Sequence, residues 1–158
     1  MFFLIIVIIS SILLVLNIYN SYQFKHNDLS INIQNELNKK EQYLINKIKY
    51  EFNINVKIPI IISNKMPNNL YGLATFDKEE KITIYLNKKM FQESKDYMIN
   101  NVLAHEYAHA LMFVFGNTTN KNGGHTKQWQ NICKRIDGIK CERFVNSNDI
   151  IINKRNLF

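Results

Sequence analysis

The sequence has 158 residues, enough for one domain of ordinary size but not for two. With Gly at 5 and Pro at 2, collagen-like and Pro/Gly-rich disordered chains are excluded, and two cysteines exclude a disulfide-rich mini-fold and a four-thiolate zinc site. The net charge of +7 permits nucleic acid, acidic protein or an anionic membrane as a partner, and does not choose among them.

The N-terminal residues 2–19 form an apolar run without a charge. About 18 helical residues at 1.5 Å each span roughly 27 Å, close to the hydrocarbon thickness of a bilayer. Tyr19 and Tyr22 follow where an interfacial aromatic belt would lie. A cleaved signal sequence and a buried helix are the alternatives, but no basic segment precedes the run and no small-residue cleavage site follows it. We therefore predict a transmembrane anchor over residues 1–22.

The side of the membrane is predicted from the lysines that follow the run, of which Lys25 is the first. The positive-inside rule places these lysines, and the domain behind them, in the cytosol of a single-pass membrane protein. Unpaired Cys133 and Cys141 would fit a reducing compartment, whereas a secreted protein could pair them.

After a polar linker at residues 20–27, the sequence predicts an amphipathic helix of about 20 residues with Asp28 as its N-cap. Its apolar positions recur mostly at steps of three and four: Leu29, Ile33, Leu37, Leu44, Ile48 and Phe52.

Three short β-strands are predicted next, at residues 56–62, 71–76 and 81–86. Pro59 favours an edge position for the first strand, and the residues between the second and third are typical of a hairpin turn. We expect Ile82–Leu86 to be the edge that accepts an extended peptide, with Gly72 allowing close approach of the backbone.

Two further helices are predicted, at residues 97–115 and 126–136, with Gly116 ending the first. The predicted fold class is therefore α+β: a helix, a small three-stranded sheet and two helices, behind an N-terminal transmembrane helix.

The residues His105-Glu106-Tyr107-Ala108-His109 form an H-E-x-x-H motif within the long predicted helix. Residues four apart lie on one helix face, so both imidazoles can bind a single Zn²⁺. Glu106 is placed beside the metal rather than among its ligands, as a general base that takes a proton from water. Two histidines and a glutamate on an apolar helix would be costly unless paired or metal-bound.

The third zinc ligand has two candidates. His125 follows a glycine-rich loop sixteen positions after His109, and Glu142 is the acidic alternative farther along the chain. We favour His125, because Glu142 lies in a segment without a helical pattern. Three neutral imidazoles leave one Zn²⁺ position open, which is the arrangement of a catalytic rather than a structural site.

HEYAHAL at residues 105–111 and GGHTKQW at residues 123–129 resemble the SprT-like zinc metalloprotease domain, which includes the Spartan-type proteases. The resemblance implies a zincin-like minimal metalloprotease domain over residues 35–146, preceded by a linker and helix start at 23–34 and followed by a tail at 147–158. It also implies that His105, His109 and His125 bind one Zn²⁺, that Glu106 is catalytic, and that Trp129 is the aromatic residue four positions after the third ligand.

The resemblance implies a zinc-dependent endopeptidase that acts on unfolded or DNA-associated proteins. Thr126 replaces a glycine that often follows the third histidine, and the two cysteines cannot form the four-cysteine zinc ribbon of many members. The lysines are scattered rather than gathered in a basic patch, so nucleic acid is permitted but not indicated. The alternative function is a membrane-tethered, non-catalytic zinc-binding adaptor of the same fold.

Overall fold

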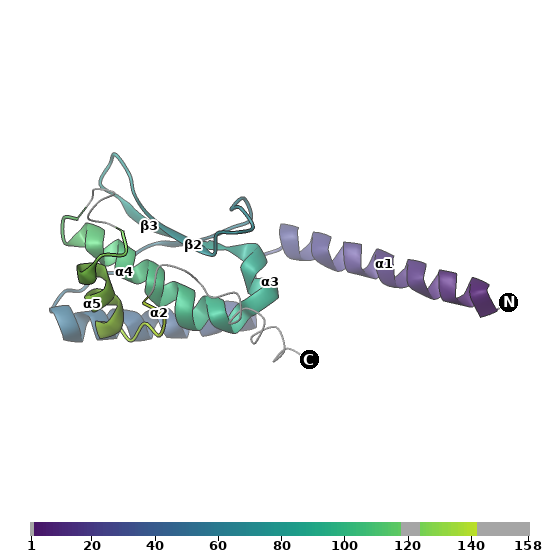
Figure 1. Cartoon of the computed structure of the whole chain (residues 1–158), viewed down its shortest axis with the longest axis horizontal. Coiled ribbons are helices and arrows are strands. Elements are labelled where there is room, and N and C mark those ends of the chain that lie inside the picture. Colours follow the sequence, from purple (N-terminus) through teal and green to yellow (C-terminus); the bar gives the residue numbers. More distant parts are fainter. Residues whose placement is uncertain (1, 118–123, 142–158) are drawn as a thin grey trace. The chain divides into compact units, whose positions relative to one another are not determined.

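A computed structural model describes residues 2–117 and 124–141, and it divides into two units, Met1–Ser30 and Ile31–Phe158. The predicted tail at 147–158 and the alternative ligand Glu142 lie outside the described residues. Within the described residues, the larger unit is an α+β domain in which four helices accompany a small mixed sheet (Figure 1).

The first unit is formed mainly by one helix, α1 (Phe2–His26), none of whose residues is buried. By length and composition this helix can cross a membrane, although a signal sequence near the N-terminus has the same properties. The helix continues to His26, through most of the segment predicted as a polar linker.

The second unit begins with α2 (Ile31–Phe52), which confirms the predicted amphipathic helix. The helix starts at Ile31 rather than directly after Asp28, so Asp28 is not its N-cap. Its buried face repeats at steps of four, three and four residues, as expected for one stripe of a helix against a core. The buried residues are Leu37, Glu41, Leu44 and Ile48.

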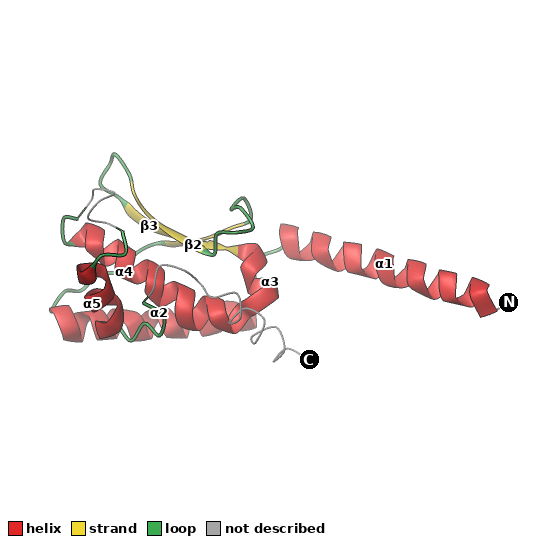
Figure 2. Cartoon of the chain, viewed as in Figure 1, coloured by secondary structure: helices red, strands yellow, loops and turns green. Residues whose placement is uncertain are grey.

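The sheet consists of β1 (Ile60–Ser63), β2 (Gly72–Phe76) and β3 (Ile82–Asn87) (Figure 2). The strand order is β1-β3-β2, with β1 parallel and β2 antiparallel to β3. The predicted edge position after Pro59 and the hairpin between β2 and β3 are confirmed. The prediction that Ile82–Leu86 is an edge is wrong, because β3 pairs with a strand on each side and β2 is the edge beside it.

The hairpin turn and the burial of β3 follow from local chemistry. The carboxylate of Asp77 accepts hydrogen bonds from the backbone N–H groups of Glu79 and Lys81, at 2.8 and 2.9 Å. Along β3, Ile84 and Leu86 are fully buried, as the alternating pattern predicts. The sheet therefore presents one apolar face to the helices.

The helical segment that carries the H-E-x-x-H motif starts earlier than predicted. It consists of α3 (Lys88–Tyr97), the π-helix η1 (Met98–Val102) and α4 (Leu103–Val114). The side chain of Asn87 caps α3 by accepting a hydrogen bond from the backbone N–H of Lys89 at 3.1 Å. Gly116, with φ of +81°, follows the end of α4, as predicted.

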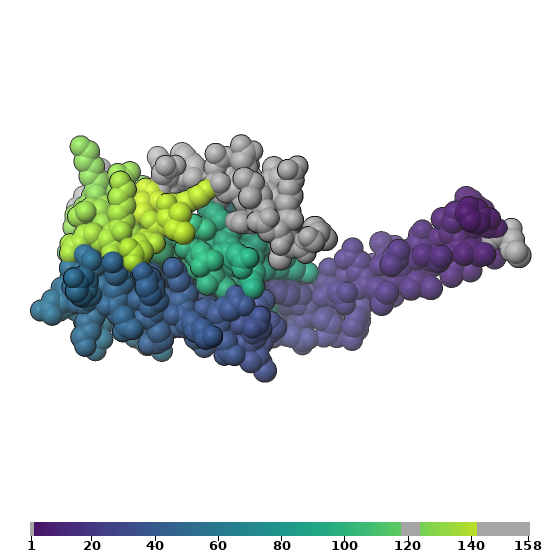
Figure 3. Space-filling view, turned by 90° about the horizontal axis from the view of Figure 1, so that it is seen from below, coloured from purple at the N-terminus to yellow at the C-terminus, as the bar shows by residue number. Residues whose placement is uncertain are grey.

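The last described helix, α5 (Lys127–Arg135), confirms the predicted helix at 126–136. Thr126 is its N-cap and accepts a hydrogen bond from the backbone N–H of Trp129 at 3.2 Å. α5 lies beside α2 in the space-filling view of Figure 3. Arg135 of α5 donates a hydrogen bond to the carboxylate of Glu51 in α2 at 3.0 Å.

Candidate metal centre

Helix α4 has three different surroundings along its length. Tyr107 points toward α2, where its hydroxyl donates a hydrogen bond to the buried carboxylate of Glu41 at 3.1 Å. Glu106 lies against β2, and His105 and His109 face Trp129 of α5. Consecutive residues of the motif therefore face different elements of the domain, because about 100° of rotation separates neighbours on a helix.

The three histidines predicted as ligands come together. The Nε2 atom of His125 lies 3.0 Å from Nε2 of His105 and 3.2 Å from Nε2 of His109. Four-coordinate zinc with Zn–N bonds of about 2.0 to 2.1 Å places neighbouring ligand nitrogens about 3.3 Å apart. Within the described residues, these histidines are the group of ligand-type side chains whose donor atoms converge.

The chemistry of these nitrogens indicates a cation between them. Two ring nitrogens at hydrogen-bond distance can share at most one proton, and Nε2 of His125 faces two such partners. At most one of the two short contacts can therefore be a well-formed N–H···N hydrogen bond, whereas a cation between the nitrogens would accommodate both. Three imidazoles without a thiolate fit zinc, so the residues present match the ion that the sequence predicts.

Burial keeps the first of these histidines neutral. Desolvation, and after it the charge of His125, lower the pKa of His105 to about 4, while a hydrogen bond to the backbone carbonyl of Lys140 acts in the opposite direction. A neutral imidazole is the form that binds a metal, so His105 is ready to bind at neutral pH without first losing a proton.

The indole ring of Trp129 packs against all three histidine rings. Its ring centroid lies 4.7 Å from that of His105, 4.9 Å from that of His109 and 4.4 Å from that of His125. The indole is fully buried, so it limits the rotation of all three rings. The predicted aromatic residue four positions after His125 thus has a packing role.

Glu106 is buried, with a relative exposure of 7%, on the side of α4 that faces β2. Burial raises the pKa of its carboxyl to about 8, although a hydrogen bond from the backbone N–H of Ala74 acts against this shift. Gly72 provides the space for this carboxylate, because a Cβ at that position would lie 2.8 Å from Oε1 of Glu106. A carboxyl with this pKa can take up and release a proton near neutral pH.

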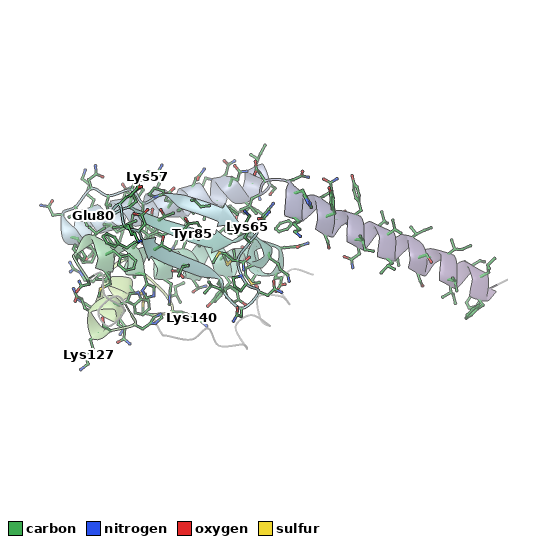
Figure 4. The ribbon with its side chains drawn as sticks, turned by 90° about the horizontal axis from the view of Figure 1, so that it is seen from above. Lys57, Lys65, Glu80, Tyr85, Lys127 and Lys140 are labelled. Atoms are coloured by element: carbon green, nitrogen blue, oxygen red, sulfur yellow. A yellow bond between two sulfur atoms is a disulfide. The ribbon has the colours of Figure 1, made fainter. Side chains whose placement is uncertain are left out.

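Three structural neighbours of the motif were not identified as such from the sequence. The backbone N–H of Ala74 and the backbone carbonyl of Lys140 contact Glu106 and His105, and backbone groups leave no signature in residue type. The third is the disulfide that joins Cys133 to Cys141. Figure 4 shows Lys140, which lies inside the segment closed by this disulfide, and Lys127 of α5 on the side of the domain away from Lys57.

The chain was compared with protein families, with curated proteins and with solved structures. A family description, the SprT-like family, matches residues 19–149 and so covers most of the chain. No curated protein matches, and no solved structure matches. The matched range contains the three convergent histidines, Glu106 and the strands beside them. The chain belongs to the SprT-like family.

Proposed function

We propose that this protein is a zinc-dependent endopeptidase that hydrolyses peptide bonds, with Glu106 as the general base. The observation that carries the proposal is the convergence of three histidine Nε2 atoms, two from the H-E-x-x-H helix and one from the segment just before α5, with His125 at 3.0 and 3.2 Å from the other two. Membership of the SprT-like family supports a domain of the metalloprotease type.

His105, His109 and His125 would hold the ion. Zinc, when bound to three imidazoles, acts as a Lewis acid and lowers the pKa of water toward neutrality. Glu106 accepts the proton of the attacking water at its carboxylate and transfers it to the leaving amine. The hydrogen bond from the backbone N–H of Ala74 fixes the carboxylate in position for both proton transfers.

The edge of β2 is the proposed binding place for an extended peptide, in place of β3. The backbone N–H of Ile84 donates to the carbonyl of Pro59, toward β1, at 2.9 Å. Ala74 is the partner of Ile84 in the antiparallel pair, so the N–H and carbonyl of Ala74 point away from β3; the N–H donates to Glu106, and the carbonyl is the group that a peptide can use. The same alternation turns the backbone groups of Gly72 to this edge, where a peptide can add as a further strand beside Glu106.

Substitution of Gly72 by alanine is expected to lower the rate of peptide hydrolysis by about 100-fold, as displacement of a reacting group by about 1 Å does. The new Cβ would lie 2.6 Å from Cγ and 2.8 Å from Oε1 of Glu106, so the carboxylate must move. The measurement is the initial cleavage rate of the zinc-loaded full chain. Leu73→Ala is the matched control, because Leu73 is the next residue of β2 and its side chain is 44% exposed. A Gly72→Ala rate equal to that of the control would contradict the role of this contact.

We also propose that α1 anchors the domain in a membrane, on the side away from the cytosol. The cytosolic placement predicted from the lysines depends on few charges, whereas a disulfide such as Cys133–Cys141 persists in oxidising compartments. When cells that contain the full chain are lysed directly into denaturant and maleimide, neither cysteine is expected to be modified until a reductant is added. Labelling of both cysteines without a reductant would place the domain in the cytosol.

The proposed activity is tested with the full chain in detergent, with casein as an unfolded substrate and histone as a DNA-binding substrate. We expect cleavage that stops when a chelator removes the metal and returns when zinc is added. Adding single-stranded DNA to the histone reaction tests whether DNA-associated protein is the preferred substrate. Stoichiometric zinc without cleavage of either protein would instead support the non-catalytic adaptor.

A further inference from the structure

A disulfide closes a short loop at the end of α5, the helix that carries Trp129. Cys133 belongs to α5 and is fully buried, and Cys141 is 8% exposed. The two residues are eight positions apart in the sequence. We call residues 133–141 the disulfide loop. Because both sulfurs are covered, the bond forms part of the domain interior rather than an external cross-link.

The turn inside the disulfide loop is built to place the two cysteines side by side. Asp137 has a φ of 59°, and the backbone N–H of Gly138 donates to the carbonyl of Cys133 at 2.8 Å. A Cβ on Gly138 would lie 2.5 Å from Sγ of Cys133 and 3.1 Å from Sγ of Cys141. The same Cβ would lie 2.8 Å from the backbone oxygen of Cys133, so only glycine fits in the turn that brings the two cysteines together.

The disulfide loop also contacts a proposed zinc ligand. The backbone carbonyl of Lys140, the residue before Cys141, accepts a hydrogen bond from the ring of His105. Nε2 of His105 faces the other two imidazoles, so the donating nitrogen is Nδ1. A ligand imidazole is commonly held in this way, because a bond at one ring nitrogen fixes the tautomer and turns the other nitrogen to the metal.

We propose that the Cys133–Cys141 disulfide is a positioning element of the metal centre: it holds the Lys140 carbonyl against His105 and so sets the affinity for zinc. The inference rests on the proposed zinc site. The loop has a second attachment, because the carboxylate of Asp137 accepts a hydrogen bond from the hydroxyl of Tyr43 and lies 3.3 Å from Nζ of Lys47. That attachment holds the turn, three residues before Lys140, whereas the disulfide holds Cys141, the residue directly after Lys140.

The test is a zinc affinity measurement on the full chain in detergent, by competition with a chromogenic chelator. The double variant Cys133→Ala/Cys141→Ala is expected to bind zinc about 10- to 100-fold more weakly than the wild type, the usual effect of losing an outer partner of a ligand histidine. Tyr43→Phe is the matched control, since it removes the tyrosine hydrogen bond of the other attachment of the same loop, and its zinc affinity is expected to stay near the wild-type value.

A second measurement avoids substitution altogether. A water-soluble phosphine reduces the disulfide of the wild-type chain to two thiols, and the phosphine takes up oxygen from water to become its oxide. The reduced chain is expected to show the same loss of zinc affinity, and reoxidation is expected to restore it. In the zinc-free chain, ¹⁵N NMR of the imidazoles is expected to show His105 protonated at Nδ1 when oxidised and as a mixture of tautomers when reduced.

The possible results separate this inference from the proposed function. Tight zinc binding by the wild type, with weaker binding by both the double variant and the reduced chain, supports the positioning role. Equal zinc affinity in all three forms would overturn that role and leave the zinc site intact. A wild-type chain that binds no zinc would overturn the metal centre itself, and this inference with it.

Discussion

Glu106→Gln is expected to abolish most of the peptide hydrolysis by the zinc-loaded chain, with a rate reduced by about 10²- to 10⁴-fold, while zinc stays bound. Glutamine keeps the size of the side chain and one oxygen that can accept the hydrogen bond from Ala74. It cannot take up a proton at neutral pH, so the attacking water loses its base. The measurement is the cleavage rate of casein together with the zinc content of the same preparation.

A suitable control for this substitution is Glu41→Gln. Glu41 is also a buried carboxylate of the domain, with an exposure of 7%, but it accepts a hydrogen bond from Tyr107 on the α2 side of α4. The amide oxygen of glutamine can accept the same bond, so this variant is expected to cleave casein as the wild type does. Undiminished cleavage by Glu106→Gln would rule out its role as general base.

His125→Ala is expected to weaken the affinity for zinc by more than about 100-fold. Loss of an outer partner of a ligand weakens metal affinity by roughly 10- to 100-fold, and this substitution removes one of the three proposed ligands itself. Its Nε2 lies close to Nε2 of both other histidines, so its loss leaves two nitrogens from one helix. Cleavage should disappear with the metal. Zinc per chain, measured after gel filtration in chelator-treated buffer, checks the result.

His26→Ala serves as the control for the loss of a histidine as such, because His26 lies in α1, outside the domain that holds the other three. We expect this variant to retain zinc at the wild-type level. Full zinc content in His125→Ala would show that His125 is not a ligand.

Much of the centre could be predicted because its signals are local. The four-residue spacing of His105 and His109 places them on one helix face. Two histidines and a glutamate in an otherwise apolar helix are costly to bury unless they are paired or bind a metal, which points to a functional role. The helix at residues 126–136 was also predicted, and the structure shows Thr126 as the N-cap at its start, directly after His125. The alternation of apolar and polar side chains along β3 could also be predicted, because it depends only on the two-residue period of a strand.

Features that depend on distant contacts could not be predicted in the same way. Strand order is decided by packing between segments far apart in the sequence, so Ile82–Leu86 was placed at the edge although β3 is central. The start of α3 was missed because KKMFQESKDY is polar and its cap, Asn87, ends a strand. Asn87 becomes recognisable only once its side-chain amide is seen donating to the carbonyls of Pro67 and Leu70, at 2.9 and 2.7 Å.

The π-helix η1 directly before α4 also has no signature in MINNV. Its wider turn changes which residues of the following helix face the sheet and which face α5, and such turns are frequent near functional sites. The pairing of Cys133 with Cys141 belongs to the same group, because it depends on a turn at Asp137 and Gly138 that brings the two residues to a Cα–Cα distance of 5.7 Å.

X-ray absorption at the zinc edge of the full chain tests the central claim most directly. We predict one zinc per chain, bound by three imidazole nitrogens at about 2.0 to 2.1 Å and one oxygen, with no sulfur, because both cysteines are joined to each other. A sulfur shell at about 2.3 Å, or a chain that holds no zinc when the ion is supplied, would contradict the account.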